Sequence, residues 1–70
     1  MKIERLIKMA NDIGNFFNSE SDKEIAAEGI KNHILRSWDP RMRKAIIAYC
    51  QEGGAELNDL VKTAIAKLAA

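Results

Sequence analysis

The chain has 70 residues, enough for one domain at most. Its 11 Lys and Arg residues nearly balance its 10 Asp and Glu residues, giving a formal net charge of +1 and a sequence pI of about 7.9. Domains dedicated to nucleic-acid binding usually have a pI above about 9, so the charge argues against that class. The 47% of hydrophobic and 30% of charged residues are ordinary globular values and argue against intrinsic disorder.

The chain has few residues that could reinforce such a small core. Cys50 is the single cysteine, so an internal disulfide is excluded, and Cys50 with His33 supplies only two ligands of a typical four-ligand zinc site. The sequence has no apolar run near the ~20 residues of a membrane span, and its charged N-terminus lacks the apolar block of a signal peptide. We therefore expect a cytoplasmic protein that is stabilised by a partner or by self-association.

The first helix is predicted over Lys2–Asn18, because apolar residues recur there at steps of three and four. Met9 and Phe16 lie just beside this stripe. Gly14 lies inside the helix, where it costs ~1 kcal/mol relative to alanine and permits the close approach of another backbone. The stripe consists of Ile3, Leu6, Ile7, Ala10, Ile13 and Phe17.

The second helix is predicted to start in the segment Ser21-Asp22-Lys23-Glu24 and to end near Trp38. That segment has the pattern of a capping box, in which Ser21 caps the helix and Glu24 reaches back to the Ser21 amide. Asp22 and Glu24 also suit the positive end of the helix dipole. The expected apolar face consists of Ile25, Ala26, Gly29, Ile30, His33 and Ile34.

The pair Asp39-Pro40 is expected to join the second and third helices with almost no loop. Proline disfavours the helical conformation in the preceding residue, aspartate is a good N-cap, and proline suits the first helical position. The third helix is predicted from Pro40 to about Glu52 and is terminated by a left-handed turn at Gly53-Gly54. Its inward stripe is expected to consist of Met42, Ala45, Ile46, Tyr49 and Cys50.

The fourth helix is predicted to begin near Asn58-Asp59 and to run towards the C-terminus. Because strand-like alternation is not sustained anywhere, the predicted fold class is all-α: a small bundle of about four short helices, in a single domain over residues 1–70. The expected buried stripe of the fourth helix consists of Leu57, Leu60, Val61, Ala64, Ile65 and Leu68.

Several polar residues are of types found in catalytic sites but lack the sequence context of one. No nucleophile elbow, cysteine-protease signature or glycine-rich phosphate loop surrounds Ser21, His33, Asp39 or Cys50. His33 is interpreted as a half-buried histidine and Cys50 as a small buried hydrophobic residue. We therefore assign no catalytic, cofactor-binding or metal-ligating residue.

The segment Arg36–Lys44 contains four cations, one acid and a tryptophan in nine residues. Arginine and tryptophan are enriched at binding hot spots, so one interpretation is a patch that docks on another protein or contacts phosphate. The other is a solvated helix start with Trp38 completing the core. A helix-turn-helix DNA reader would present Arg41, Arg43 and Lys44 to the major groove, but the near-neutral charge and the abrupt joint argue against it.

Four stretches of the sequence resemble the delta subunit of soluble NAD-dependent formate dehydrogenase, in matching order and spacing over nearly the whole chain. One departure is Asp59, where the family pattern has a proline; Asp59 can still begin a helix after Asn58. The stretches are Lys8-Met9-Ala10-Asn11-Asp12-Ile13-Gly14-Asn15-Phe16-Phe17, Gly29-Ile30-Lys31-Asn32-His33-Ile34, Trp38-Asp39-Pro40-Arg41-Met42-Arg43 and Gly53-Gly54-Ala55-Glu56-Leu57.

The resemblance implies a non-catalytic accessory subunit that docks on the catalytic large subunit of a cytoplasmic complex and supports its assembly, stability or cofactor loading. Such complexes oxidise formate to carbon dioxide and pass the electrons to NAD. They carry a molybdenum or tungsten pterin, iron–sulfur clusters and flavin in their other subunits. The alternative is a stand-alone helical module that self-associates or binds nucleic acid weakly.

The interface with the large subunit is expected around the start of the third helix. Arg41 and Arg43 each lie about 100° from the inward-facing Met42, so they flank the core stripe. Both are cations at the positive end of a helix, where stability alone would favour acids. The expected interface residues are Trp38, Asp39, Pro40, Arg41, Arg43 and, on the first helix, Phe16.

Overall fold

The computed structural model describes residues 2–70, and four helices account for most of that range. They are α1 (Ile3–Phe17), α2 (Lys23–Ser37), α3 (Pro40–Gln51) and α4 (Asp59–Ala69). No strand occurs within residues 2–70, so the predicted all-α fold is confirmed. The predicted ends of the helices lie close to the observed ones.

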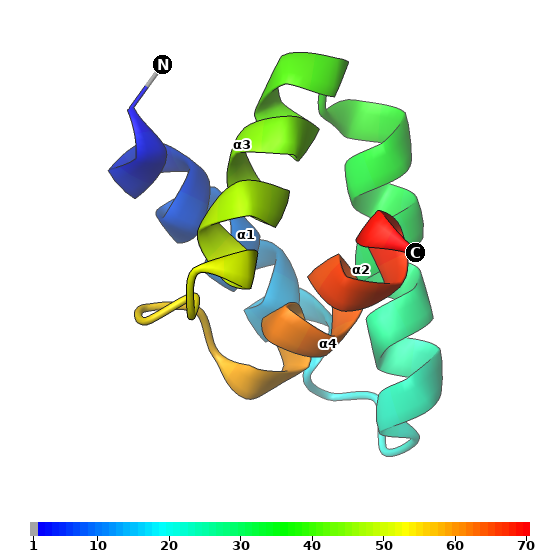
Figure 1. Cartoon of the computed structure of the whole chain (residues 1–70). Coiled ribbons are helices and arrows are strands. Elements are labelled where there is room, and N and C mark those ends of the chain that lie inside the picture. The colour runs from blue at the N-terminus through cyan, green and yellow to red at the C-terminus, as the bar shows by residue number, and fades with distance from the viewer. Residues whose placement is uncertain (1) are drawn as a thin grey trace.

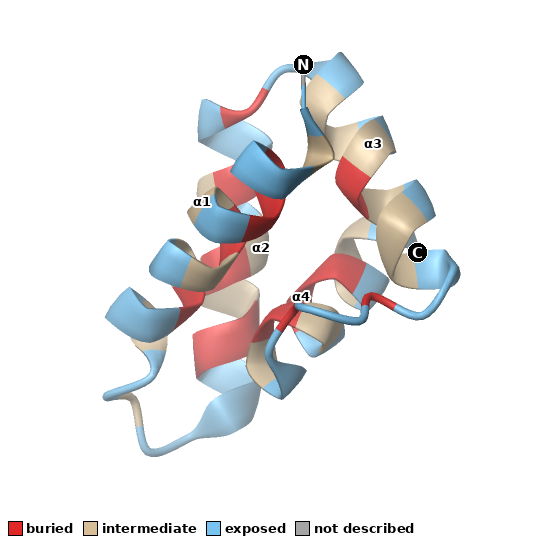
Figure 2. Ribbon diagram, turned by 90° about the vertical axis from the view of Figure 1, so that its left-hand side faces the viewer, coloured by how far each residue is buried: buried red, intermediate tan, exposed pale blue. Residues whose placement is uncertain are grey.

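The four helices surround a shared interior, and the molecule measures 32 × 24 × 21 Å along its principal axes. Figure 1 shows α2 along one side, α1 and α3 on the other, and α4 below α3, running towards α2 and ending beside it. The most extensive contact is between α2 and α4, and α1 touches all three other helices. Buried residues lie on the inward sides of the helices (Figure 2).

The core draws residues from every helix, from the α2–α3 joint and from the loop before α4. Close packing of α1 on α4 depends on Gly14, because a Cβ at that position would lie 2.5 Å from Val61 Cγ2. The sequence predicted the close approach of another backbone at Gly14; the neighbours observed there are instead the side chains of Val61 and Asn58. The buried cluster consists of Leu6, Ile7, Ala10, Ala27, Ile30, Ile34, Trp38, Ile46, Leu57, Val61, Ala64 and Ile65.

The start of α2 differs from the prediction by one residue. Asp22, not Ser21, is the N-cap: its Oδ1 accepts hydrogen bonds from the amides of Glu24 (3.0 Å) and Ile25 (3.3 Å). The Asp22 amide donates to Glu20 Oε1 at 3.0 Å. The predicted capping box is thus wrong, because the neighbouring aspartate serves two free amides and adds negative charge at the positive helix end.

The apolar face of α2 also differs in one position. Ile25 was expected on this face but is 59% exposed, and Ala27 is buried instead. At about 100° per residue, Ile25 lies about 140° around the helix from Ile30, whereas Ala27 lies about 60° from it, so the predicted face was too wide. The buried side of α2 is therefore rotated towards Ala27.

The caps of α3 and α4 agree with the prediction. Asn58 Oδ1 accepts the Val61 amide at 3.0 Å at the start of α4. After α3 the chain turns at Gly53 and Gly54, whose φ angles of 122° and 58° lie in the region that favours glycine. The left-handed ending of α3 is therefore confirmed.

A reciprocal pair of hydrogen bonds ties the α3–α4 loop to α1. The Asn11 side-chain amide donates to the Glu56 carbonyl at 2.9 Å, and its oxygen accepts the Asn58 amide at 3.1 Å. One side chain on α1 thus fixes the loop immediately before the N-cap of α4.

Ion pairs connect α2 with α4 on the outer side of their contact. Lys67 pairs with Glu24 and with Glu28 (3.4 Å), and Lys31 pairs with Glu28 at 3.2 Å. Hydrogen bonding and charge from Lys31, with a further contribution from Lys67, lower the pKa of Glu28. Hydrogen bonding and charge from Glu24, followed by Glu28, raise the pKa of Lys67.

Candidate docking surface

The α2–α3 joint consists of Trp38 and Asp39. The Trp38 amide still donates to the Ile34 carbonyl at 2.9 Å, which completes the last turn of α2. Asp39 is extended, and its Oδ1 accepts the Met42 amide at 2.9 Å. The prediction that Asp39 caps α3 is confirmed, and Pro40 occupies its first turn. Asp39 and Pro40 are both exposed, but each has a role in starting the helix.

Trp38 is only 4% exposed and belongs to the core cluster. Of the two interpretations given to this residue, its burial supports the one in which it completes the core. The indole has almost no exposed surface with which to contact a partner. Its position directly before the N-cap anchors the start of α3 to the interior.

Arg43 has an intramolecular role that its sequence position did not reveal. Its Nη1 donates to the Trp38 carbonyl at 2.5 Å, and the side chain is half-buried. The bond satisfies a carbonyl at the C-terminus of α2, the negative end of that helix dipole. A cation that is unfavourable for α3 is therefore favourable for the helix that precedes it.

Arg41 differs from Arg43 because its side chain is exposed. Within residues 2–70, no hydrogen bond or ion pair within the chain involves its guanidinium group. Of the residues expected at the joint, Arg41 therefore keeps a surface position without an internal function.

Phe16 is the most exposed large apolar side chain among the described residues, at 77%. Its ring meets Phe17 edge to face, with centroids 5.2 Å apart. Beside it lies a hollow of about 300 Å³, lined by Asp12, Ile13, Phe16, Phe17 and His33. An exposed aromatic ring next to an apolar hollow is a typical feature of protein-binding surfaces.

The Phe17 ring, which forms part of the hollow, packs onto Gly29 of α2. A Cβ at Gly29 would lie 2.6 Å from Phe17 Cε1, so this contact requires glycine or a displaced ring. His33 follows one turn later on α2 and is half-buried at the edge of the hollow. The sequence interpretation of His33 as a half-buried histidine is confirmed, but its proximity to Phe16 was not foreseen.

Two further exposed apolar side chains, Ile25 (59%) and Leu35 (48%), lie on α2. The sequence analysis placed Ile25 on the apolar face and made no assignment for Leu35. The available signal was angular, because both residues lie about 140° around the helix from Ile30.

The described residues offer little for other kinds of site. Within residues 2–70, no group of three or more His, Cys, Asp or Glu side chains is placed to hold a metal ion. Cys50 is half-buried and packs against the core, which partly fits its interpretation as a buried hydrophobic residue. Among these same residues, no helix has the length and apolar character needed to cross a bilayer.

These features define a small all-helical protein with an exposed aromatic ring beside an apolar hollow. A family model described as "NADH-dependent formate dehydrogenase delta subunit FdsD" matches residues 5–65. The chain therefore belongs to the family of formate dehydrogenase delta subunits, as its resemblance implied. Neither the curated proteins nor the solved structures gave a match.

Proposed function

We propose that this chain is a non-catalytic accessory subunit that docks on the catalytic large subunit of NAD-dependent formate dehydrogenase and supports its assembly or stability. The family match over residues 5–65 is the observation that carries the proposal. In this proposal the pterin with molybdenum or tungsten, the iron–sulfur clusters and the flavin belong to the other subunits of a cytoplasmic complex.

The hollow beside Phe16 supports docking as the role of the chain. Exposing a phenylalanine to water forgoes roughly 1.5–3 kcal/mol of burial free energy, so the ring contributes little to the isolated fold. A partner that covers the ring and fills the hollow would recover that free energy in the complex. We therefore propose Phe16 as the central apolar contact with the large subunit.

Co-purification tests the proposal. The tagged chain is expressed together with the formate dehydrogenase subunits of the same host, and the recovered complex is analysed by mass spectrometry and gel filtration. The wild-type chain is expected to recover the large subunit, whereas Phe16→Ala is expected to weaken binding roughly tenfold or more. Ile25→Ala removes another large exposed apolar side chain, from α2, and serves as the control.

Recovery of the wild-type chain alone, as a self-associated species or bound to DNA, would support the alternative of a stand-alone helical module. Equal binding by wild type and Phe16→Ala would move the interface away from this hollow. The isolated chain is also expected to reduce no NAD with formate and to contain no stoichiometric metal, since none of its sequence motifs is typical of cluster or flavin binding. One tightly bound metal per chain would contradict that expectation.

A further inference from the structure

The charge of α3 differs from that of the other helices. Its twelve residues include Arg41, Arg43 and Lys44 but no Asp or Glu. All three cations lie in the N-terminal half of α3, and Arg41 lies in its first turn, where the helix dipole is positive and cations are unfavourable. The aspartate that precedes them, Asp39, already accepts the Met42 amide at 2.9 Å. The fold itself therefore gives little reason for this concentration of positive charge.

The contacts of the three cations separate them into two groups. Arg43 is explained by its bond to the Trp38 carbonyl. Arg41 and Lys44 are both exposed, and no ion pair among residues 2–70 includes either of them. Being three apart on a helix, they are neighbours on one face. We call Arg41 and Lys44 the α3 cation pair.

The face that carries the α3 cation pair continues without charge along the rest of the helix. Ala48 and Gln51 follow at steps of four and three, and both are exposed. Neither of these side chains carries a charge, so no acid on this face competes for the two cations. The face thus combines a concentrated positive charge with an uncharged continuation.

We infer that the α3 cation pair recognises an acidic surface of the large subunit; this inference rests on the proposed function. The planar guanidinium of Arg41 can bind a carboxylate through two parallel hydrogen bonds, and Lys44 adds a second charge beside it. A carboxylate partner would also neutralise two charges that oppose the dipole of α3. The pair therefore determines the orientation and rate of docking, while Phe16 supplies apolar contact.

Protein carboxylates fit this surface better than nucleic acid. The net charge of the chain is +1, and a polyanion would also meet Asp39 beside the pair. A protein that binds the DNA backbone tightly makes about six to ten contacts with phosphates, several times the two cations of this face. The inference is therefore restricted to a local acidic patch on a protein.

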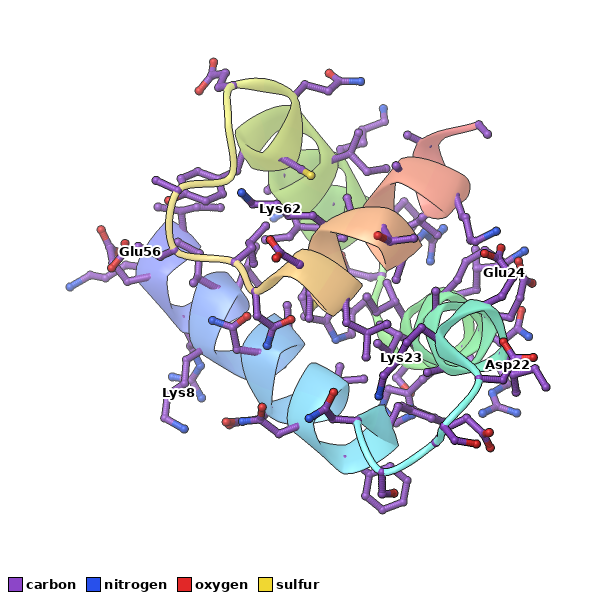
Figure 3. The ribbon with its side chains drawn as sticks, turned by 90° about the horizontal axis from the view of Figure 1, so that it is seen from below. Lys8, Asp22, Lys23, Glu24, Glu56 and Lys62 are labelled. Carbon is purple, nitrogen blue, oxygen red and sulfur yellow. The ribbon has the colours of Figure 1, made fainter. Side chains whose placement is uncertain are left out.

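A pair of identical composition and spacing on α1 provides a matched control. Arg5 and Lys8 are also exposed and three residues apart. Lys8, however, pairs with Asp12 at 2.8 Å, and Glu4 lies one turn before Lys8 on the same face. Figure 3 shows Lys8 pointing outward from α1. The charge of Lys8 is therefore balanced locally, so the control pair should contribute less to recognition than the α3 cation pair.

The experiment measures binding of the purified chain to immobilised large subunit at increasing sodium chloride concentration. The variants are Arg41→Gln with Lys44→Gln, and the control Arg5→Gln with Lys8→Gln. Removing the α3 cation pair is expected to lower the association rate roughly tenfold and to flatten its salt dependence. The control variant is expected to keep the wild-type association rate and its salt dependence. The α3 variant should also melt at the wild-type temperature or above it, because two charges opposed to the helix dipole are gone.

If the wild-type chain binds the large subunit and neither double variant changes the association rate or its salt dependence, this inference is overturned and the proposed function stands. Failure of the wild-type chain to bind the large subunit would overturn both. A lower melting temperature of the α3 variant would show a structural role and count against recognition. If the wild-type chain binds a DNA duplex and the α3 variant does not, the inference is wrong, because the α3 cation pair then recognises nucleic acid and not an acidic protein surface.

Discussion

The starts of α2 and α3 use the same capping residue but differ in their surroundings. Asp22 caps α2 next to Glu24, so acids gather at the positive end of the helix. Asp39 caps α3, yet Arg41 and Lys44 follow it. One aspartate is thus sufficient to start a helix in either electrostatic setting. The difference shows that the charge around α3 is not determined by helix formation.

The two helix starts are also held to the rest of the molecule by different means. At α2, Lys23 Nζ donates hydrogen bonds to the carbonyls of Asn18 (2.8 Å) and Glu20 (3.0 Å), and Figure 3 shows the direction of the Lys23 side chain. Glu24 in the same turn pairs with Lys67 of α4. At α3, the buried indole of Trp38 provides the attachment. The α2 start is therefore held by polar contacts at the surface, and the α3 start by the buried indole with the bond from Arg43 to the Trp38 carbonyl. Arg41 and Lys44 take no part in either attachment.

The largest expected effect comes from removing the core attachment of α3. Trp38→Ala is expected to cost about 3–5 kcal/mol of unfolding free energy, because it leaves a cavity under the joint. That equals most of the stability available to a domain of this size. Urea unfolding followed by circular dichroism measures the loss. The matching residue before the α2 cap is the exposed Ser21, and Ser21→Ala should change stability by less than about 0.5 kcal/mol. Similar urea midpoints for Trp38→Ala and Ser21→Ala would contradict the proposed difference between the two helix starts.

A smaller effect is expected from removing either cap. Asp39→Ala and Asp22→Ala should each cost roughly 0.5–2 kcal/mol, since each leaves amides of the first helical turn without an acceptor. Asn is as good a cap, so Asp39→Asn is expected to retain most of the stability. Thermal melts of the three variants test this. A wild-type melting temperature for Asp39→Ala would mean that the cap contributes nothing to stability.

The smallest effect concerns the charges that hold α2 to α4. The pKa of Glu28 is lowered in the fold, so its contribution is present above its ordinary value of 4.5 and is lost as the pH falls through that value. The pKa of Lys67 is raised, so its contribution is present below 10.5 and is lost as the pH rises further. Between these limits the melting temperature should be insensitive to both groups. In a plot of melting temperature against pH, Glu28→Gln should reduce the fall in melting temperature at acid pH. An acid limb identical to that of the wild type would contradict a stabilising role for the Glu28 ion pairs.

Most of the fold could be predicted because its determinants are local in sequence. The caps at Asp39 and Asn58 and the turn at Gly53 and Gly54 depend on residues only a few positions apart. The start of α2 was misplaced because Ser21 and Asp22 are both good caps, and only the structure distinguishes them. Local rules thus identified the helices, and their errors were confined to a choice between neighbours.

The surface was harder to predict because it depends on contacts between residues of different helices. Arg43 binds the carbonyl of Trp38 across the joint, so a residue expected at the partner interface has a structural role. His33 reaches the hollow beside Phe16 only because α1 and α2 pack together. Helical spacing gives the direction of a side chain around its own helix, but it does not give the neighbour that side chain meets.

The contact between Gly29 and Phe17 has a consequence for the outer surface of the molecule. Because the Phe17 ring occupies the space that a Cβ of residue 29 would need, α1 is held in one rotation relative to α2. Phe16 is displaced about 100° around the helix from Phe17, so the same rotation directs its ring into solvent. The absence of a Cβ at Gly29 of α2 therefore determines the direction of the exposed Phe16 ring on α1. A larger residue at position 29 would require the Phe17 ring to move, and we expect the direction of the exposed Phe16 ring to change with it.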